Sequence, residues 1–148
     1  MRTIYKIGTL ALTVLMTASL WSCADVNEEF VFVHDTNTIE AMFLSASHAG
    51  SAFTGEIHEF NKAGELIKGA FTQQEVEGGY GLIIFRIPRS LENDINLSNV
   101  YLRANVTFTV FIAPGLSGRH DITGDGIIIT VTSGVGTTRQ YRVRGVYE

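Results

Sequence analysis

The clearest candidate for metal chemistry is the segment Asp121-Ile-Thr-Gly-Asp125-Gly126. It carries oxygen-bearing side chains at positions one, three and five and glycine at position six, as at the start of an EF-hand calcium loop. Position twelve is Thr132, where such a loop needs a bidentate glutamate, and Ile127–Ile129 is typical of a strand. We therefore expect a tight turn in which Asp121 caps its own loop, and no metal or other cofactor. A calcium site is the alternative.

The histidines and hydroxyl side chains lack the spacing of a catalytic or metal site. No histidine lies three or four residues from another histidine or from cysteine, which is the usual ligand spacing; the four are His34, His48, His58 and His120. His48 and Ser51 are close in sequence, but closeness alone does not orient a base on a nucleophile. The sequence therefore predicts a protein without catalytic residues, which is not an enzyme.

Aromatic side chains are the remaining candidates for ligand contact, because a flat ring stacks well on a sugar. Tyr80, Tyr101 and the polar Asn105 are the ligand-binding residues we predict, with Tyr147 as a further candidate. Three arginines crowd the last predicted strand, namely Arg139, Arg142 and Arg144. Such a stripe could bind an acidic partner, but more often it marks a charged edge strand that discourages pairing with another chain.

Cys23 is the chain's single cysteine and follows a segment built like an export signal. Arg2 and Lys6 precede 14 uncharged, mostly apolar residues, Ile7 to Leu20, which are too few to span a bilayer but suit a cleavable signal. Leu20-Trp-Ser-Cys23 resembles the bacterial lipobox, which directs a lipid to the cysteine thiol. We expect residues 1–22 to be removed and Cys23 to be lipidated. The alternatives are an ordinary secretory signal with an incidental cysteine, or an uncleaved anchor.

The remainder of the chain is acidic and free of other thiols. All 15 acidic residues but only nine of the 11 basic ones lie after residue 22, which leaves a net charge of −6. This charge argues against nucleic acid as a partner. Residues 23–37 are expected to form a lipidated tether, whose start, Ala24 to Glu29, resembles the surface-export signal of Bacteroidetes lipoproteins or is simply solvated. Phe30–Val33 is apolar and suits a first strand or a segment laid against the domain.

From Thr38 onward the residues alternate with the period of two that is typical of strands. In Val100–Ile112 every even position is apolar, so we expect Val106 and Phe108 to lie inside. This run is long for one globular strand, and a bend or a change of sheet is expected near Asn105–Thr107.

Other runs are also β-rich, and Leu82–Phe85, apolar at every position, favours a central strand ended by Pro88. Seven or eight short strands with regular turns predict an all-β, antiparallel β-sandwich formed by one domain, residues 38–148. 

A family resemblance spans this domain. Residues 38–148 resemble an uncharacterised family of Bacteroidetes surface-lipoprotein domains, a domain of unknown function with an immunoglobulin-like sandwich. Its segments here are Ile39–Phe43, Ile95–Leu97, Pro114–Gly118 with Asp121–Thr123, and Ile129–Gly134 with Tyr141–Val143. Members often occur beside glycan-uptake proteins, so the resemblance implies a setting at the outer membrane and not an activity.

Two functions follow as expectations. The first is a non-catalytic accessory module at the cell surface, anchored in the outer membrane through the lipid on Cys23, that binds a glycan or a neighbouring protein. The second is a structural spacer or a pilus-like assembly subunit, which would show a donor strand or an empty groove, and Phe30–Val33 is the segment of interest for it. A sandwich fold alone does not decide between them.

Overall fold

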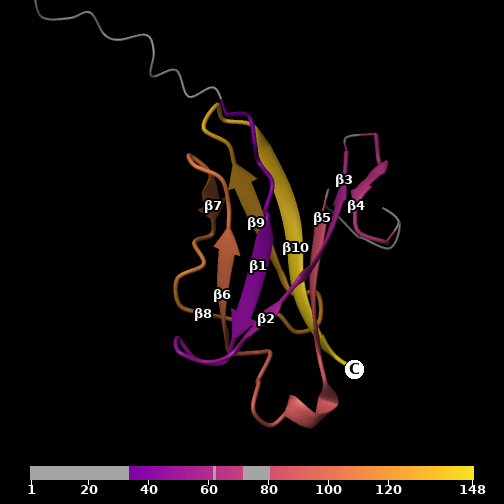
Figure 1. Cartoon of the computed structure of the whole chain (residues 1–148), viewed down its shortest axis with the longest axis vertical. Helices are drawn as coiled ribbons and strands as arrows, with labels where there is room; N and C mark the ends of the chain where they lie inside the picture. Colours follow the sequence, from indigo (N-terminus) through magenta and orange to yellow (C-terminus); the bar gives the residue numbers. More distant parts are fainter. Residues whose placement is uncertain (1–33, 62, 72–80) are drawn as a thin grey trace, which may run out of the picture. The chain divides into compact units, whose positions relative to one another are not determined.

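The computed structural model describes residues 34–61, 63–71 and 81–148, all within one compact unit, Phe32–Glu148. These residues form two β-sheets that pack against each other (Figure 1). The expected all-β sandwich is confirmed. Predictions that concern Cys23, Phe30–Val33 and Tyr80 lie outside the described residues.

The smaller sheet is antiparallel throughout and has the strand order β2-β1-β6-β8. Its strands are β1 (Ala41–Ser45), β2 (Ala52–Thr54), β6 (Val100–Asn105) and β8 (Arg119–His120). Met42 and Leu44 on β1 and Val100 and Leu102 on β6 alternate toward the core, because successive side chains of a strand point to opposite faces.

The larger sheet has the order β4-β3-β5-β10-β9-β7. Its strands are β3 (Glu56–Phe60), β4 (Leu66–Lys68), β5 (Gly81–Ile87), β7 (Phe111–Ala113), β9 (Ile127–Thr132) and β10 (Thr138–Tyr147), and a short 3-10 helix, η4 (Arg89–Leu91), follows β5. The described chain thus has ten strands and not seven or eight. Four of them, β2, β4, β7 and β8, have only two or three residues, too few to show a period in the sequence.

The centre of the larger sheet is buried on both faces. Every residue of β5 except Arg86 is buried, which confirms the expected central strand. Inward side chains such as Phe85 join the main core between the sheets, while Leu82 and Ile84 join Phe60 in a second apolar cluster on the outer face. Phe71 and Val146 pack against this second cluster.

One strand pair departs from the antiparallel expectation. β10 runs parallel to β5, with Val143 opposite Ile83. After β5 the chain passes through the other sheet and returns by β7 and β9 before β10 begins, and parallel neighbours require such a long crossover. β10 therefore lies inside the sheet, so the expectation that its arginines mark a charged edge is wrong.

The long alternating run divides where a change of sheet was expected. β6 belongs to the smaller sheet and ends at Asn105, and β7 belongs to the larger sheet. Val106 packs against the main core as expected, but Phe108 is 88% exposed, so its predicted burial is wrong. The chain is no longer extended here, since Thr109 has φ of 66°, and alternation holds only along an extended chain.

Candidate functional site

Tyr101 lies at the centre of a group of side chains on the outer face of the smaller sheet. It sits on β6 opposite Ser45 of β1 and Arg119 of β8. The imidazole of His48, from the loop after β1, lies 4.0 Å from the Tyr101 ring, centroid to centroid. From the other neighbouring strand, the Arg119 Cζ atom lies 4.5 Å from the ring centroid. Three segments that are far apart in sequence therefore meet on one ring.

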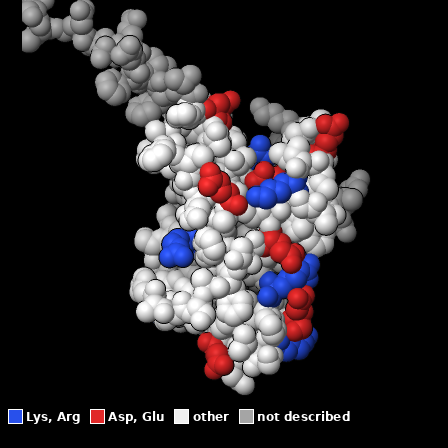
Figure 2. All heavy atoms as spheres, viewed as in Figure 1, with Lys and Arg blue, Asp and Glu red and all other residues white. Residues whose placement is uncertain are grey.

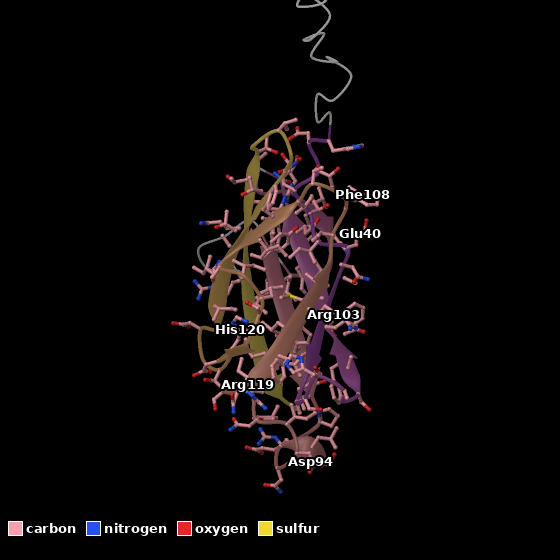
Figure 3. All side chains as sticks on the ribbon, turned by 90° about the vertical axis from the view of Figure 1, so that its left-hand side faces the viewer. Glu40, Asp94, Arg103, Phe108, Arg119 and His120 are labelled. Atoms are coloured by element: carbon pink, nitrogen blue, oxygen red, sulfur yellow. The ribbon has the colours of Figure 1, made fainter. Side chains whose placement is uncertain are left out.

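A second arginine stacks on a second ring on the same face. Arg103 of β6 lies opposite Phe43 of β1, and its Cζ atom is 5.3 Å from the centroid of that ring. An arginine over an aromatic face is attracted by the ring quadrupole. We call Phe43, His48, Tyr101, Arg103 and Arg119 the aromatic–arginine face. Arg103 and Arg119 are both exposed and both labelled in Figure 3.

Neither arginine of this face has a carboxylate partner among the described residues. The ion pairs found in that part of the chain involve other side chains, and the contact of Arg119 besides the ring is a hydrogen bond from Nη1 to the Asn99 carbonyl oxygen, 2.8 Å. In Figure 2 a single blue group stands over β6 in a largely uncharged area, while red and blue spheres alternate over β3 and β5. The guanidinium groups therefore keep donors available to a ligand.

The structure places two of the sequence-predicted site residues on this face without bringing them together. Tyr101 and the exposed Asn105 point to the same side of β6, but they are four positions apart, which is roughly 13 Å along the strand. Arg103 lies between them. The strand period already put these three residues on one face, whereas Phe43, His48 and Arg119 could be found only from the strand order.

Tyr147, the further candidate, has its hydroxyl occupied within the protein. The hydroxyl donates to the Ile95 carbonyl oxygen at 2.7 Å and accepts from the Leu97 backbone N–H at 3.1 Å. These two bonds fix the loop that leads from η4 to β6. Tyr147 thus has a structural role in holding that loop.

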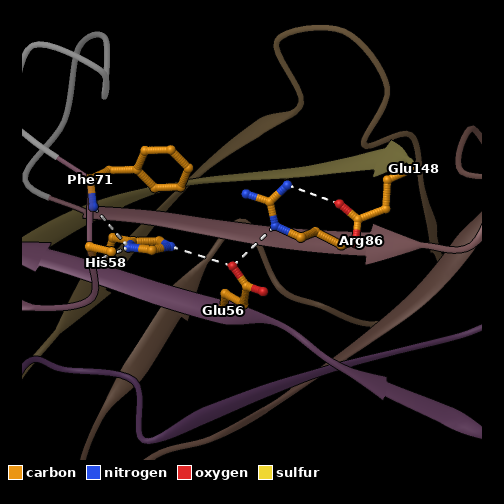
Figure 4. A network of polar contacts seen from close by, with 6 residues as sticks. Glu56, His58, Phe71, Arg86 and Glu148 are labelled. Atoms are coloured by element: carbon orange, nitrogen blue, oxygen red, sulfur yellow. Dashed lines mark hydrogen bonds and ion pairs between the residues drawn. The ribbon is translucent and has the colours of Figure 1, made fainter.

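A second polar group lies on the outer face of the larger sheet (Figure 4). His58 on β3 is only 4% exposed, and its Nδ1 atom accepts hydrogen bonds from the backbone N–H groups of Ala70, 2.8 Å, and Phe71, 3.4 Å. The Phe71 ring lies edge-on to the imidazole at 4.5 Å between centroids. We call His58, Glu56, Arg86 and Glu148 the His58 network.

The carboxylates of this network neutralise its arginine. Arg86 of β5 lies 3.2 Å from Glu56 and 3.1 Å from Glu148, measured from its guanidinium nitrogens to the carboxylate oxygens. The hydrogen bond to Glu148, and then that to Glu56, raises the pKa of Arg86. Its positive charge is thereby satisfied within the protein.

The hydrogen bonds and the burial of His58 disfavour a role as a general acid or base. Because Nδ1 accepts two backbone hydrogen bonds, the neutral ring carries its proton on Nε2, which lies 3.9 Å from a Glu56 oxygen. Burial lowers the pKa of His58, which keeps the ring neutral. The ring acts as an acceptor that fixes the chain at residues 69–71. A side chain at Gly69 would clash with it, since an added Cβ would lie 2.2 Å from Nδ1.

The three arginines of β10 do not form one stripe. Arg139 lies on the same side as the buried Tyr141, and its Nη1 donates to the Phe60 carbonyl oxygen at 3.0 Å. Arg142 and Arg144 alternate to the outer face, where Arg142 donates to the Asp125 carbonyl oxygen at 3.0 Å. The basic-stripe hypothesis is therefore wrong, because alternation sends these side chains to opposite sides of the sheet.

A buried polar contact near Arg139 ties the start of the domain to its last strand. The Tyr141 hydroxyl donates to Glu59 Oε1 at 2.6 Å and accepts from the Ile39 backbone N–H at 3.3 Å. Burial, together with the hydrogen bond to Glu59, raises the pKa of Tyr141. The tyrosine therefore stays protonated and serves to hold β3, β10 and the chain before β1 together.

The segment from Asp121 to Gly126 adopts the expected tight turn. Asp121 Oδ1 accepts from the backbone N–H of Thr123 at 2.9 Å and from its hydroxyl at 2.6 Å, and these bonds lower the pKa of Asp121. Gly126 has φ of 67°, and a Cβ there would lie 2.0 Å from the Val143 carbonyl oxygen. In the residues that the structure describes, no three histidine, cysteine or acidic side chains group as a metal site.

Comparison with known proteins leaves the family open. No family model matches the chain, and no curated protein does either. None of the described helices has the length and apolar character needed to cross a membrane.

Two solved structures show weak similarity. One, from Bacteroides fragilis, is named a "putative secreted protein"; it is 14% identical, with a TM-score of 0.39, over 75% of this chain and 92% of that one. The other, from Bacteroides thetaiotaomicron, is named a "putative glycoside hydrolase"; it is 18% identical, also with a TM-score of 0.39. That match covers 45% of this chain but only 18% of the other. At these TM-scores neither similarity informs the function.

Proposed function

We propose that this protein is a non-catalytic module of the cell surface, held at the outer membrane by a lipid on Cys23, that binds an acidic oligosaccharide at the aromatic–arginine face. One observation carries the proposal. Arg103 and Arg119 are each stacked on an aromatic ring, are exposed, and have no carboxylate partner in the described part of the chain.

The chemistry of the face suits a sugar that bears carboxylate or sulfate groups. A guanidinium group offers paired donors to such anions, and an aromatic ring offers a flat apolar surface to the sugar. Arg103 and Arg119 occupy diagonal positions on β6 and β8, and residues in such positions are typically about 7–8 Å apart. Ring stacking also restricts the arginines before binding, which reduces the entropy lost when a ligand orders them.

The net charge of the chain makes this pairing more informative. Without residues 1–22 the chain has a net charge of −6 and as a whole repels anions, so two arginines without carboxylate partners on one face form a local exception to its negative field. In the His58 network, by contrast, two carboxylates satisfy one arginine. The acidic oligosaccharide is therefore proposed for the smaller sheet.

Absence of turnover is part of the proposal. The buried His58 has Nδ1 occupied by backbone donors, and His48 stacks on Tyr101. Neither has a hydrogen-bonded serine, threonine or cysteine among the described residues, as an activated nucleophile would require. The purified protein should leave oligosaccharides and peptides intact, and hydrolysis of either would contradict the passive role.

The test begins with an array of acidic and neutral glycans, followed by calorimetry with an oligosaccharide that binds. The double variant Arg103→Gln, Arg119→Gln should lose affinity about tenfold or more, equivalent to about 1.4 kcal/mol. The matched control is Arg89→Gln, an exposed arginine of η4 outside this face, which should bind as the parent does. Binding should also weaken as salt is raised, because ions screen exposed charges.

Other outcomes would revise the ligand. Selective binding of neutral sugars that depends on Tyr101 but not on the arginines would overturn the acidic class. Capture of an acidic protein with no glycan binding would replace the oligosaccharide by a protein partner. Equal affinity of the double variant and the Arg89→Gln control would show that the ligand does not bind at this face.

A further inference from the structure

One end of the sandwich gathers the start of the described chain and two connections. Near that start, the Thr137 hydroxyl donates to Asp35, and the Asn37 side chain donates to the Thr137 hydroxyl at 3.3 Å. Thr137 belongs to the β9–β10 turn, residues 133–137. We call this end the entry pole (Figure 1).

The connection from β6 to β7 reaches the same pole. The Glu40 backbone N–H donates to the Asn105 carbonyl oxygen at 3.0 Å, so β6 ends beside the chain that enters β1. β7 then starts with Phe111 opposite Thr132, the last residue of β9. Residues 106–110 therefore lie at the entry pole, and Figure 3 shows Phe108 near the end where the described chain begins.

The entry pole carries large apolar side chains in contact with solvent. Phe108 is 88% exposed, Phe111 is 71% exposed and Val135 is 48% exposed. These are three of the six exposed large apolar residues in the described chain, and the two phenylalanines are the most exposed of all. The other three lie on β4 and β9.

We infer that the entry pole rests on the lipid bilayer in which the Cys23 lipid is anchored, with Phe108, Phe111 and Val135 at the membrane interface. The inference relies on the predicted lipidation of Cys23, not on the oligosaccharide site. Ten residues separate Cys23 from His34, and ten residues extend over at most about 36 Å. The chain that leads to the anchor therefore enters the domain at the pole that carries its most exposed apolar side chains.

The lipid tether also explains how three apolar side chains could be enough for contact with the membrane. Phenylalanine is among the side chains that interfacial segments bury at the boundary between headgroups and acyl chains. Because the lipid already holds the protein at the bilayer, contact by the pole is an intramolecular step with a high effective concentration. Asp35 and Glu40 are exposed near the pole, so attraction to anionic lipid is not required and a zwitterionic bilayer should serve.

Orientation is the consequence of this contact. β6 ends at the pole and its earlier residues lie farther from it, so the aromatic–arginine face would stand beside the membrane and not against it. Figure 3 shows Arg119 and Asp94 progressively farther from the end that carries Phe108. A ligand outside the cell could then reach the face while the pole holds the domain upright.

The experiment uses the full lipidated chain in phosphatidylcholine vesicles that contain a spin-labelled phosphatidylcholine. Acylation blocks Cys23, so Val135→Cys supplies a single thiol for an environment-sensitive fluorophore. The matched control is Asp94→Cys, an exposed position away from the entry pole. We expect a blue shift and quenching by the spin-labelled lipid at position 135, and neither effect at position 94.

A second variant removes the apolar contact and keeps the anchor. Phe108→Asp with Phe111→Asp, in the chain labelled at position 135, should float with the vesicles but lose most of the quenching. Its oligosaccharide affinity should equal that of the parent, which separates this test from that of the aromatic–arginine face. Both phenylalanines are exposed, so circular dichroism and thermal unfolding should show an intact fold.

Four results would overturn the inference. Floating protein with no quenching at position 135 would show that the pole does not meet the bilayer. Equal quenching at both positions would show that bilayer contact is not specific to the pole. A blue shift that grows with protein concentration without quenching would show that a second copy covers the pole. Protein that fails to float with the vesicles would show that no lipid anchors the chain, which overturns the inference.

Discussion

The outer faces of the two sheets differ in the groups that contact their arginine side chains. On the larger sheet, Arg86 is held between Glu56 and Glu148, beside an apolar cluster in which Leu82 is only 3% exposed. On the smaller sheet, Arg103 and Arg119 lie over aromatic rings and no carboxylate neutralises them within the described residues.

The difference indicates which face serves the stability of the fold and which is available to a ligand. Around Arg86 the outer face of the larger sheet is buried and its charges are paired, so this part of the face contributes to stability. The aromatic–arginine face is half-exposed and keeps unpaired donors, so its arrangement is better suited to a ligand than to the fold. Stability measurements can therefore test the comparison even before a ligand is known.

The largest expected effect is on the apolar part of the larger sheet. Leu82→Ala should lower the free energy of unfolding by about 2–5 kcal/mol, because it leaves a cavity in a buried cluster. Phe43→Ala, at the half-exposed position of the other outer face, should cost clearly less. Urea unfolding of both variants measures the two losses, and equal losses would contradict the contrast between the faces.

Next in size is the loss of the His58 acceptor. His58→Ala should destabilise the protein by about 1–3 kcal/mol, because the backbone N–H of Ala70 would lose its buried acceptor. His58→Asn is the matched control, since its side-chain oxygen can take the place of Nδ1 and should restore part of the stability. If the two variants unfold at the same urea concentration, the hydrogen bond is not what His58 supplies.

A pH dependence follows from the same residue and should be smaller. The folded pKa of His58 is lowered by burial, whereas the unfolded chain titrates at about 6.5. Below that pH the unfolded state binds a proton that the folded state resists, so stability should fall as pH decreases from about 6.5 and stay constant above it. Comparison of unfolding at pH 7.5 and 5.5 should show less of this loss in His58→Asn. An identical loss in both proteins would assign it to other groups.

The smallest effects distinguish the two kinds of arginine contact. Arg86→Gln should cost up to about 1 kcal/mol, and the cost should shrink in 1 M salt, because its partners are charged and partly exposed. Arg103→Gln should cost a similar or smaller amount with little dependence on salt, because its partner is a ring. Unfolding at 0.1 and 1 M sodium chloride would detect the difference, and a strong salt response of Arg103→Gln would reveal an ionic partner.

Local sequence patterns were sufficient for much of the fold. The period of two predicted strands and a sandwich, continuous apolar character predicted the central β5, and the length of the alternating run predicted the change of sheet after Asn105. These features depend on which residues a strand buries on each face, and a single strand contains that information. The turn at Asp121 was equally local, because its capping bonds involve residues two positions apart.

Only the tertiary structure decided how the strands are ordered, and most of the candidate site depends on that order. The sequence put Tyr101, Arg103 and Asn105 on one side of a strand, but Phe43, His48 and Arg119 join them because β1 and β8 flank β6. The parallel pairing of β5 with β10 likewise turned a supposed edge strand into an interior one. Phe108 lies outside the core because the positive φ of Thr109 ends the extended chain there. Strand pairing joins residues that are distant in sequence, so no local period contains it.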